Sequence, residues 1–146
     1  ATVFGYSYRM RTDLLVNNFV FNAIKKNELK LFEPHFRRNF IHVKDVVDAI
    51  VYSVKNFNRL KSHIYNLGLS SANISKYILA KKIKHKLKYL KIKIIKNKKD
   101  PDQRDYYVSN KKIEKKGFKA KIKIESGIDE LIEVFNNTRE NIINNY

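Results

Sequence analysis

Apolar residues recur at helical spacing in three parts of the chain. Two stripes follow the spacing i, i+3, i+4, i+7, namely Val47, Ile50, Val51, Val54 and then Ile128, Leu131, Ile132, Phe135. A third group with helical periodicity is Ile74, Ile78, Leu79, Ile83. Such spacing gathers apolar side chains on one face of an α-helix. We predict that the first two stripes pack inward and that the third helix turns its lysines toward solvent.

Two other segments of the chain show strand patterns. Residues 89–94 alternate apolar and basic side chains with period two, which is typical of a half-buried edge strand. Lysines on such an edge also discourage unwanted pairing. Residues 37–42 form a short strand pattern that runs directly into the helix carrying the first stripe.

The composition is that of a globular domain or lobe. The chain has 146 residues, of which 43% are hydrophobic, so it is long enough to bury a core. It has no cysteine, which excludes disulfides and thiol chemistry. No apolar run approaches the roughly 18 residues of a membrane span. We expect no membrane association and a cytoplasmic location.

The net charge of +17 raises the alternative of a basic nucleic-acid-binding module, since basic patches bind phosphate backbones by releasing counterions. The excess is almost all lysine, and it accompanies abundant Asn, Ile, Phe and Tyr. These five residue types share AT-rich codons, so a biased genome enriches them together without selection for a ligand. The densest basic run, residues 81–99, fits solvated helix and strand faces. We therefore rank nucleic-acid binding second.

Arginine escapes that bias, and Arg37 and Arg38 stand together at the start of a strand pattern. A guanidinium presents a rigid fork of donors that matches two phosphate oxygens at once. The pair therefore favours a phosphate clamp. The alternative for this feature is a solvated strand end.

Several segments resemble, in order, the extended short-chain dehydrogenase/reductases, the NAD-dependent epimerase/dehydratase family. The clearest segment is Arg38-Asn39-Phe40-Ile41-His42-Val43-Lys44-Asp45, which is similar to the family's RD(Y/F)IHVxD sequence. Residues 1–5 resemble a late strand of the nucleotide-binding sheet, 13–26 the next helix, 28–32 the next strand and 64–68 the family's YNLG strand. Residues 102–118 resemble its D-x-R-x-Y…GF tail.

The resemblance implies a fold and a function. The fold is α/β, the C-terminal part of a Rossmann-type enzyme, with residues 1–12 ending the nucleotide-binding sheet and 13–146 forming the smaller substrate-binding lobe. The implied function is to hold the diphosphate of a nucleotide sugar for an NAD- or NADP-dependent epimerase or dehydratase, an isomerase or lyase that is commonly a homodimer. This fragment alone is expected to be inactive.

The same resemblance suggests five substrate-binding residues. Arg38 and Arg104 are expected to grip the diphosphate. Thr2 stands where related enzymes carry a substrate-contacting residue, Asn17 offers an amide from the helix after the substrate loop, and Tyr106 faces the sugar or base, or fills the core. The alternative for Arg104 is a surface ion pair with Asp102 or Asp105, usually worth no more than about 1 kcal/mol.

The cofactor and catalytic signatures of the family are missing. Its cofactor site needs a glycine-rich turn between a strand and a helix, whereas the glycines here are scattered at positions 5, 68, 117 and 127. Three Tyr-x-x-x-Lys matches occur, at Tyr77/Lys81, Tyr89/Lys93 and Tyr107/Lys111. None lies ahead of the first strand, where the family places its catalytic pair, so we expect no catalytic residue here. The opening inside a strand pattern, without an initiator Met, suggests a fragment.

The four histidines do not suggest a metal site. They lie at positions 35, 42, 63 and 85, with no i, i+4 pair and no cysteine partner. We predict no metal, and for His42 a buried imidazole whose nitrogens both have partners.

Overall fold

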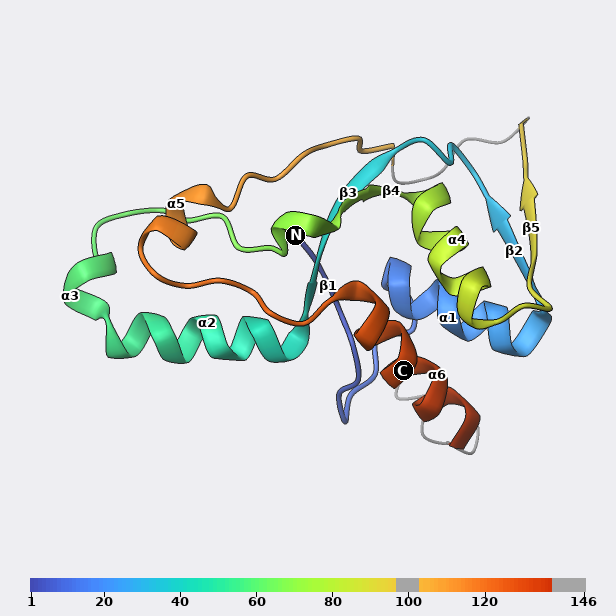
Figure 1. Cartoon of the computed structure of the whole chain (residues 1–146), viewed down its shortest axis with the longest axis horizontal. Helices are drawn as coiled ribbons and strands as arrows, with labels where there is room; N and C mark the ends of the chain where they lie inside the picture. Colours follow the sequence, from blue (N-terminus) through green and yellow to red (C-terminus); the bar gives the residue numbers. More distant parts are fainter. Residues whose placement is uncertain (97–102, 138–146) are drawn as a thin grey trace.

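The computed structural model describes residues 1–96 and 103–137 and forms a mixed α/β fold (Figure 1). The strands are β1 Thr2–Phe4, β2 Glu28–Leu31, β3 Arg37–His42, β4 Asn73–Ser75 and β5 Lys91–Ile94. The helices are α1 Leu15–Lys26, α2 Val43–Lys55, α3 Phe57–Leu60, the 3-10 turn η1 Ser70–Ala72, α4 Lys76–Lys86, α5 Lys111–Lys115 and α6 Ile124–Asn137. The expected alternation of strands and helices is confirmed.

The described strands form two small sheets. In one, β3 pairs in parallel with β1, with Val3 opposite Ile41, and antiparallel with β4, with Arg38 opposite Ile74. In the other, β2 and β5 pair in parallel, with Leu29 opposite Ile92. The prediction of a strand around residues 89–94 is confirmed.

The main core lies where α1, α4 and α6 pack together beside β2 and β5, at the right of Figure 1. Three side chains of the predicted α6 stripe, Ile128, Leu131 and Phe135, are at most 2% exposed, and Ile132 packs against them. The inward packing of this stripe is confirmed. On α4, Leu79 and Ile83 are fully buried, while Ile78 is largely exposed.

The prediction for α2 is wrong, because its apolar stripe faces outward. Val47, Ile50, Val51 and Val54 are 45–71% exposed. The helix instead buries Asp45 and Ala49, and Ala49 and the half-buried Tyr52 belong to a small second cluster at the left of Figure 1. The carboxylate of Asp45 fixes this rotation, since it accepts hydrogen bonds from the backbone N–H groups of residues 121 and 122.

The segment resembling the YNLG strand is also different from the prediction, because residues 64–68 form no strand. The chain runs close to β3 there, and a Cβ added at Gly68 would collide with the side chain of Asn39. The amide of Asn39 donates to the carbonyl of Leu69 at 2.9 Å, and the N–H of Leu69 donates to the carbonyl of Phe40 at 3.0 Å. One side-chain hydrogen bond and one backbone hydrogen bond thus join this segment to β3, in place of the regular backbone hydrogen bonds of a strand pair.

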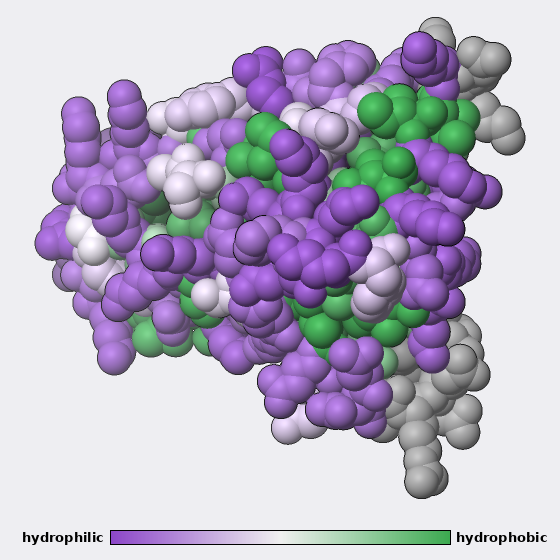
Figure 2. All heavy atoms as spheres, turned by 45° about the vertical axis from the view of Figure 1, so that its right-hand side comes forward, coloured by the Kyte–Doolittle hydropathy of each residue, from purple (hydrophilic) through white to green (hydrophobic). Residues whose placement is uncertain are grey.

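The surface on the side of β2, β5 and α4 is dominated by hydrophilic side chains, with apolar groups showing between them (Figure 2). Three lysines of α4, at positions 81, 84 and 86, are exposed there. Among the described helices, none is both long and apolar enough to cross a membrane.

Candidate functional site

Strand β3 gives its two adjacent arginines different surroundings, because successive side chains of a strand point to opposite faces. Arg37 is exposed, and its guanidinium forms a forked contact with the carboxylate of Asp105, at 3.1 Å for Nε to Oδ1 and 3.3 Å for Nη2 to Oδ2. This hydrogen bonding lowers the pKa of Asp105 below its ordinary value. Arg38 points the other way and is only 3% exposed.

The buried arginine lines a hollow of about 300 Å³. The residues around this hollow are Thr2, Asp13, Leu14, Leu15, Asn18, Arg38, Lys76 and Arg104. Arg104 reaches it from the segment that precedes α5, far along the chain from β3. Two arginines suggested by the sequence therefore border the same space, together with Thr2 from β1.

Tyr106 lies next to this group. Its hydroxyl is 3.4 Å from Oγ1 of Thr2, and its ring centroid is 5.3 Å from the guanidinium carbon of Arg38. A cation over an aromatic face is attracted by the ring quadrupole. The half-buried Tyr106 ring therefore holds the Arg38 guanidinium from one side.

Asn17, the fifth suggested residue, lies elsewhere. Its side chain is 2% exposed; Oδ1 accepts from the N–H of Gly5 at 3.1 Å, and Nδ2 donates to the carbonyl of Arg11 at 3.0 Å. It ties the loop after β1 to α1, and it is not among the residues that line the hollow. A role toward substrate stays a prediction.

The ion-pair alternative for Arg104 stays a prediction. Asp105 pairs with Arg37, and Asp102 lies outside the described residues. Arg104 itself is exposed and also interacts within the chain.

Sequence reasoning missed three polar residues of the hollow: Asp13, Asn18 and Lys76. The carboxylate of Asp13 is 2.6 Å from the guanidinium of Arg11, and this hydrogen bond lowers its pKa. The net charge contributed by Arg38, Lys76, Arg104 and Asp13 is therefore positive. The pairing of β3 with β4 brings Lys76 to this hollow, and the sequence carried no signal for the register in which the two strands pair.

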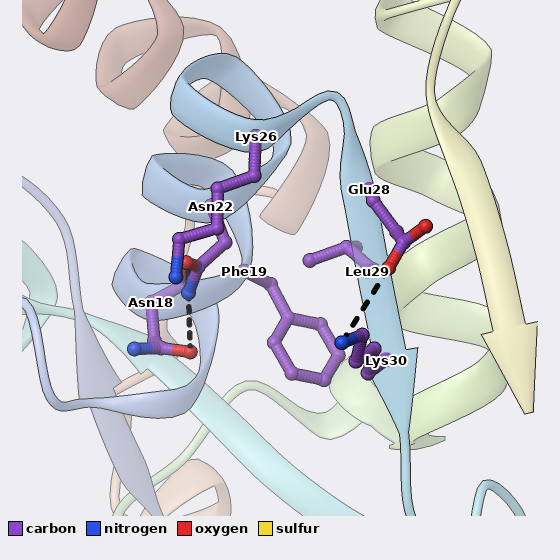
Figure 3. Close-up of a pocket in the computed structure, with 7 residues that line it drawn as sticks. All are labelled: Asn18, Phe19, Asn22, Lys26, Glu28, Leu29 and Lys30. Carbon is purple, nitrogen blue, oxygen red and sulfur yellow. Dashed lines mark hydrogen bonds and ion pairs between the residues drawn. The ribbon is translucent and has the colours of Figure 1, made fainter. Parts of the chain in front are cut away.

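A second hollow, of about 410 Å³, opens between α1 and β2 (Figure 3). Asn18 and Asn22 border it from the helix, and Glu28 and Lys30 from the strand. A hydrogen bond from Lys93 lowers the pKa of Glu28, which keeps this carboxylate charged. The cations that line this hollow, Lys26 and Lys30, are exposed, and among its described lining residues none offers the forked donors of Arg38.

His42 is a structural residue, as predicted. It is 1% exposed; Nδ1 accepts from the N–H of Lys44 at 3.3 Å, and Nε2 lies 2.6 Å from a carboxylate oxygen of Glu130. The same carboxylate binds Nζ of Lys44 at 2.6 Å and the N–H of Tyr6 at 3.3 Å. Within the described residues, no group of three or more His, Cys, Asp or Glu side chains is arranged to hold a metal ion.

Comparison with known proteins identifies the fold and the family. The family model described as "NAD dependent epimerase/dehydratase family" matches residues 1–68, which include β1, β3 and α2. This match to the NAD-dependent epimerase/dehydratase family covers a little under half of the chain. The family resemblance suggested by the Arg38 segment is thereby confirmed.

Solved structures of two epimerases and a dehydratase share this fold. The ADP-L-glycero-D-manno-heptose-6-epimerase of Helicobacter pylori is 27% identical, with a TM-score of 0.71 over 94% of this chain and 43% of its own. The UDP-glucose 4-epimerase of Thermus thermophilus, in complex with NAD, is 18% identical, with a TM-score of 0.74 over 94% of this chain and 45% of its own. An NAD-dependent NDP-hexosamine 5,6-dehydratase of tunicamycin biosynthesis is 20% identical, with a TM-score of 0.75 over 97% and 45%. The chain spans less than half the length of each of these three.

The residues present do not fit the dinucleotide cofactor of an epimerase/dehydratase by themselves. Gly5 follows β1 with a φ of +112°, but the ring of His42 fills the space where its Cβ would stand. That glycine therefore serves close packing, and the other three are scattered along the chain. Of the Tyr-x-x-x-Lys pairs, Tyr77 and Lys81 lie on α4 with the ammonium 5.7 Å from the ring centroid, and neither lines the Arg38 hollow.

Proposed function

We propose that this chain is the substrate-binding portion of an NAD- or NADP-dependent enzyme acting on a nucleotide-diphosphate sugar, and that the diphosphate lies between Arg38 and Arg104. The observation that carries the proposal is the shared hollow of these two guanidinium groups, which come from segments far apart in the chain. Each guanidinium offers forked donors to phosphate oxygens.

The surroundings of the hollow support an anionic ligand with polar groups. The hydroxyls of Thr2 and Tyr106, 3.4 Å apart, stand beside Arg38 and offer hydrogen bonds to a phosphate or sugar. A volume of about 300 Å³ is at the small end of ligand pockets, which run from about 300 to 1,000 Å³. The hollow therefore suits the diphosphate and adjoining groups of the ligand, with the remainder bound outside it.

We expect the cofactor-binding and catalytic groups to lie outside this chain. In this proposal residues 1–12 end the nucleotide-binding sheet and residues 13–146 form the substrate lobe, while the cofactor-binding turn and the catalytic Tyr and Lys belong to the rest of a cytoplasmic enzyme that acts as a homodimer. The bound nicotinamide would accept and return a hydride during epimerisation or dehydration. The chain alone is expected to bind substrate without turning it over.

Isothermal titration calorimetry with UDP-glucose, ADP-glucose, GDP-mannose and dTDP-glucose tests the proposal. We expect at least one to bind, and Arg38→Met or Arg104→Met to weaken it about ten- to a hundredfold, because a hydrogen bond to a charged group contributes about 1.5–3 kcal/mol. The matched control is Arg37→Gln, which alters the neighbouring arginine of the same strand outside the hollow. It should retain the affinity.

The net charge of +17 keeps nucleic-acid binding as the second candidate function. That candidate predicts salt-sensitive binding of a DNA or RNA duplex that survives Arg38→Met, since it would depend on many surface lysines.

Absence of binding to all four nucleotide sugars would overturn the substrate-binding proposal.

A further inference from the structure

Lys76 reaches the hollow through the register of β3 and β4. Arg38 stands opposite Ile74, and the N–H of Lys76 donates to the carbonyl of Phe36 at 3.1 Å, which continues the same antiparallel register by two residues. Residues two apart on paired strands project from the same face. Phe36, Arg38 and Lys76 therefore share one face, and both cations line the hollow.

The burial of Lys76 is unusual for a lysine. Its side chain is 2% exposed, although lysine is among the residues least often fully buried. It is the first residue of α4, where the helix dipole already adds positive potential and disfavours a cation. Arg38, 3% exposed, places a second positive charge on the same face. The local fold thus concentrates positive potential at one point.

At the start of α4, a ligand would be contacted by the ammonium of Lys76, because the first backbone N–H groups of the helix already donate hydrogen bonds within the chain. The N–H groups of Lys76, Tyr77 and Ile78 donate to the carbonyl of Phe36, the carbonyl of Pro34 and the hydroxyl of Ser75. The ring of Phe36, with its centroid 5.5 Å from Nζ, flanks the ammonium of Lys76.

We infer that Lys76 is a third cation of the substrate site and sets its preference for a diphosphate over a monophosphate. The inference rests on the proposed function and adds a residue to it. Among the described residues that line the hollow, Arg38, Lys76 and Arg104 offer three cations, so a second phosphate group could be contacted as well as the first. Arg38, Lys76 and Arg104 also interact within the chain, so a ligand competes with those contacts.

The test compares nucleoside diphosphates with their monophosphates in calorimetric titrations, using UDP/UMP, ADP/AMP, GDP/GMP and dTDP/dTMP. We expect Lys76→Met to weaken the best diphosphate about ten- to a hundredfold and the matching monophosphate much less, because one charge-assisted contact is lost. Lys76→Arg should restore most of the diphosphate preference. Lys84→Met removes the same charge from an exposed position of the same helix and is the matched control. Thermal unfolding followed by circular dichroism verifies that each variant is folded.

The outcomes of this test distinguish the Lys76 inference from the proposed function. If Arg38→Met loses the diphosphate and Lys76→Met does not, the Lys76 inference is wrong and the proposed function stands. An equal loss for diphosphate and monophosphate in Lys76→Met, or an equal loss in Lys84→Met, also overturns the role of Lys76. If the unaltered chain binds a nucleotide sugar but no nucleoside diphosphate, the Lys76 inference is wrong; if it binds neither, both proposals are wrong.

Discussion

The carboxylate of Glu130 joins α6 to the start of α2 and to the loop after β1, and its removal should destabilise the fold. It contacts buried His42 at 2.6 Å, Lys44 at 2.6 Å and the N–H of Tyr6 at 3.3 Å. Because Nδ1 of His42 accepts the N–H of Lys44, the neutral ring carries its proton on Nε2 and donates it to Glu130. Glu130→Ala would leave that buried N–H without its partner.

The expected cost follows from these contacts. A buried donor left unsatisfied costs about 1–3 kcal/mol. The contact with Lys44, whose side chain is 64% exposed, adds no more than about 1 kcal/mol. We therefore expect Glu130→Ala to lower the free energy of unfolding by about 1–4 kcal/mol. Urea unfolding followed by circular dichroism measures this change.

The control is Glu133→Ala, an exposed position of the same helix, for which a change within about 0.5 kcal/mol is expected. A cost for Glu130→Ala no larger than that of the control would refute the reasoning.

The stabilisation by Glu130 should also depend on pH. Partial burial raises the pKa of this carboxyl, but its hydrogen bonds with Lys44, His42 and the N–H of Tyr6 outweigh burial and leave the pKa below the ordinary 4.5. Since the folded-state pKa is depressed, this contribution is fully present above about pH 4.5 and is lost as the pH falls through the lower folded value. The stability difference between the unaltered chain and Glu130→Gln should shrink on acidification; a difference that grows would contradict this assignment.

Four further changes test the packing by urea unfolding. Gly127→Ala should cost about 1–3 kcal/mol despite the better helix propensity of alanine, because its Cβ would collide with the ring of Phe4; a gain in stability would contradict the close approach. Asp45→Asn should cost about 1–3 kcal/mol, because an amide cannot accept both backbone N–H groups; no loss would contradict the clamp. Val54→Asp should change stability by no more than about 0.5 kcal/mol, whereas Leu131→Ala should cost about 2–5 kcal/mol; similar costs for both would refute the outward orientation of the α2 stripe.

The sequence predicted element types well where periodicity and packing agree. The α6 stripe was placed inward and its Leu131 is fully buried. The α2 stripe was also placed inward, yet Val54 is 71% exposed. Periodicity identifies the apolar face of a helix but not what covers it. The rotation of α2 is instead set by Asp45, whose partners lie in a distant segment without a recognisable pattern.

The candidate site was predictable only in part for a similar reason. The two-residue alternation of a strand explains why Arg38 turns inward while Arg37 pairs with Asp105. Lys76 was missed because its place depends on the register of β4, a strand of only three residues. Long-range pairing of this kind is a property of the folded chain that local sequence patterns do not encode.

The outward stripe of α2 lies beside a hollow of about 360 Å³, which is lined by Tyr52 and Phe118 but also by four charged side chains, Asp48, Lys55, Lys119 and Lys121.

The most direct test of the central claim observes the two guanidinium groups while a diphosphate binds. In a chain labelled with ¹⁵N-arginine, the Nε–H signals of Arg38 and Arg104 should shift together with a single dissociation constant as the best-binding nucleoside diphosphate is added. The signal of Arg37 should stay in place, because its guanidinium is engaged with Asp105 outside the hollow. Shifts confined to one of the two arginines, or to Arg37 and surface lysines, would contradict a diphosphate held between Arg38 and Arg104.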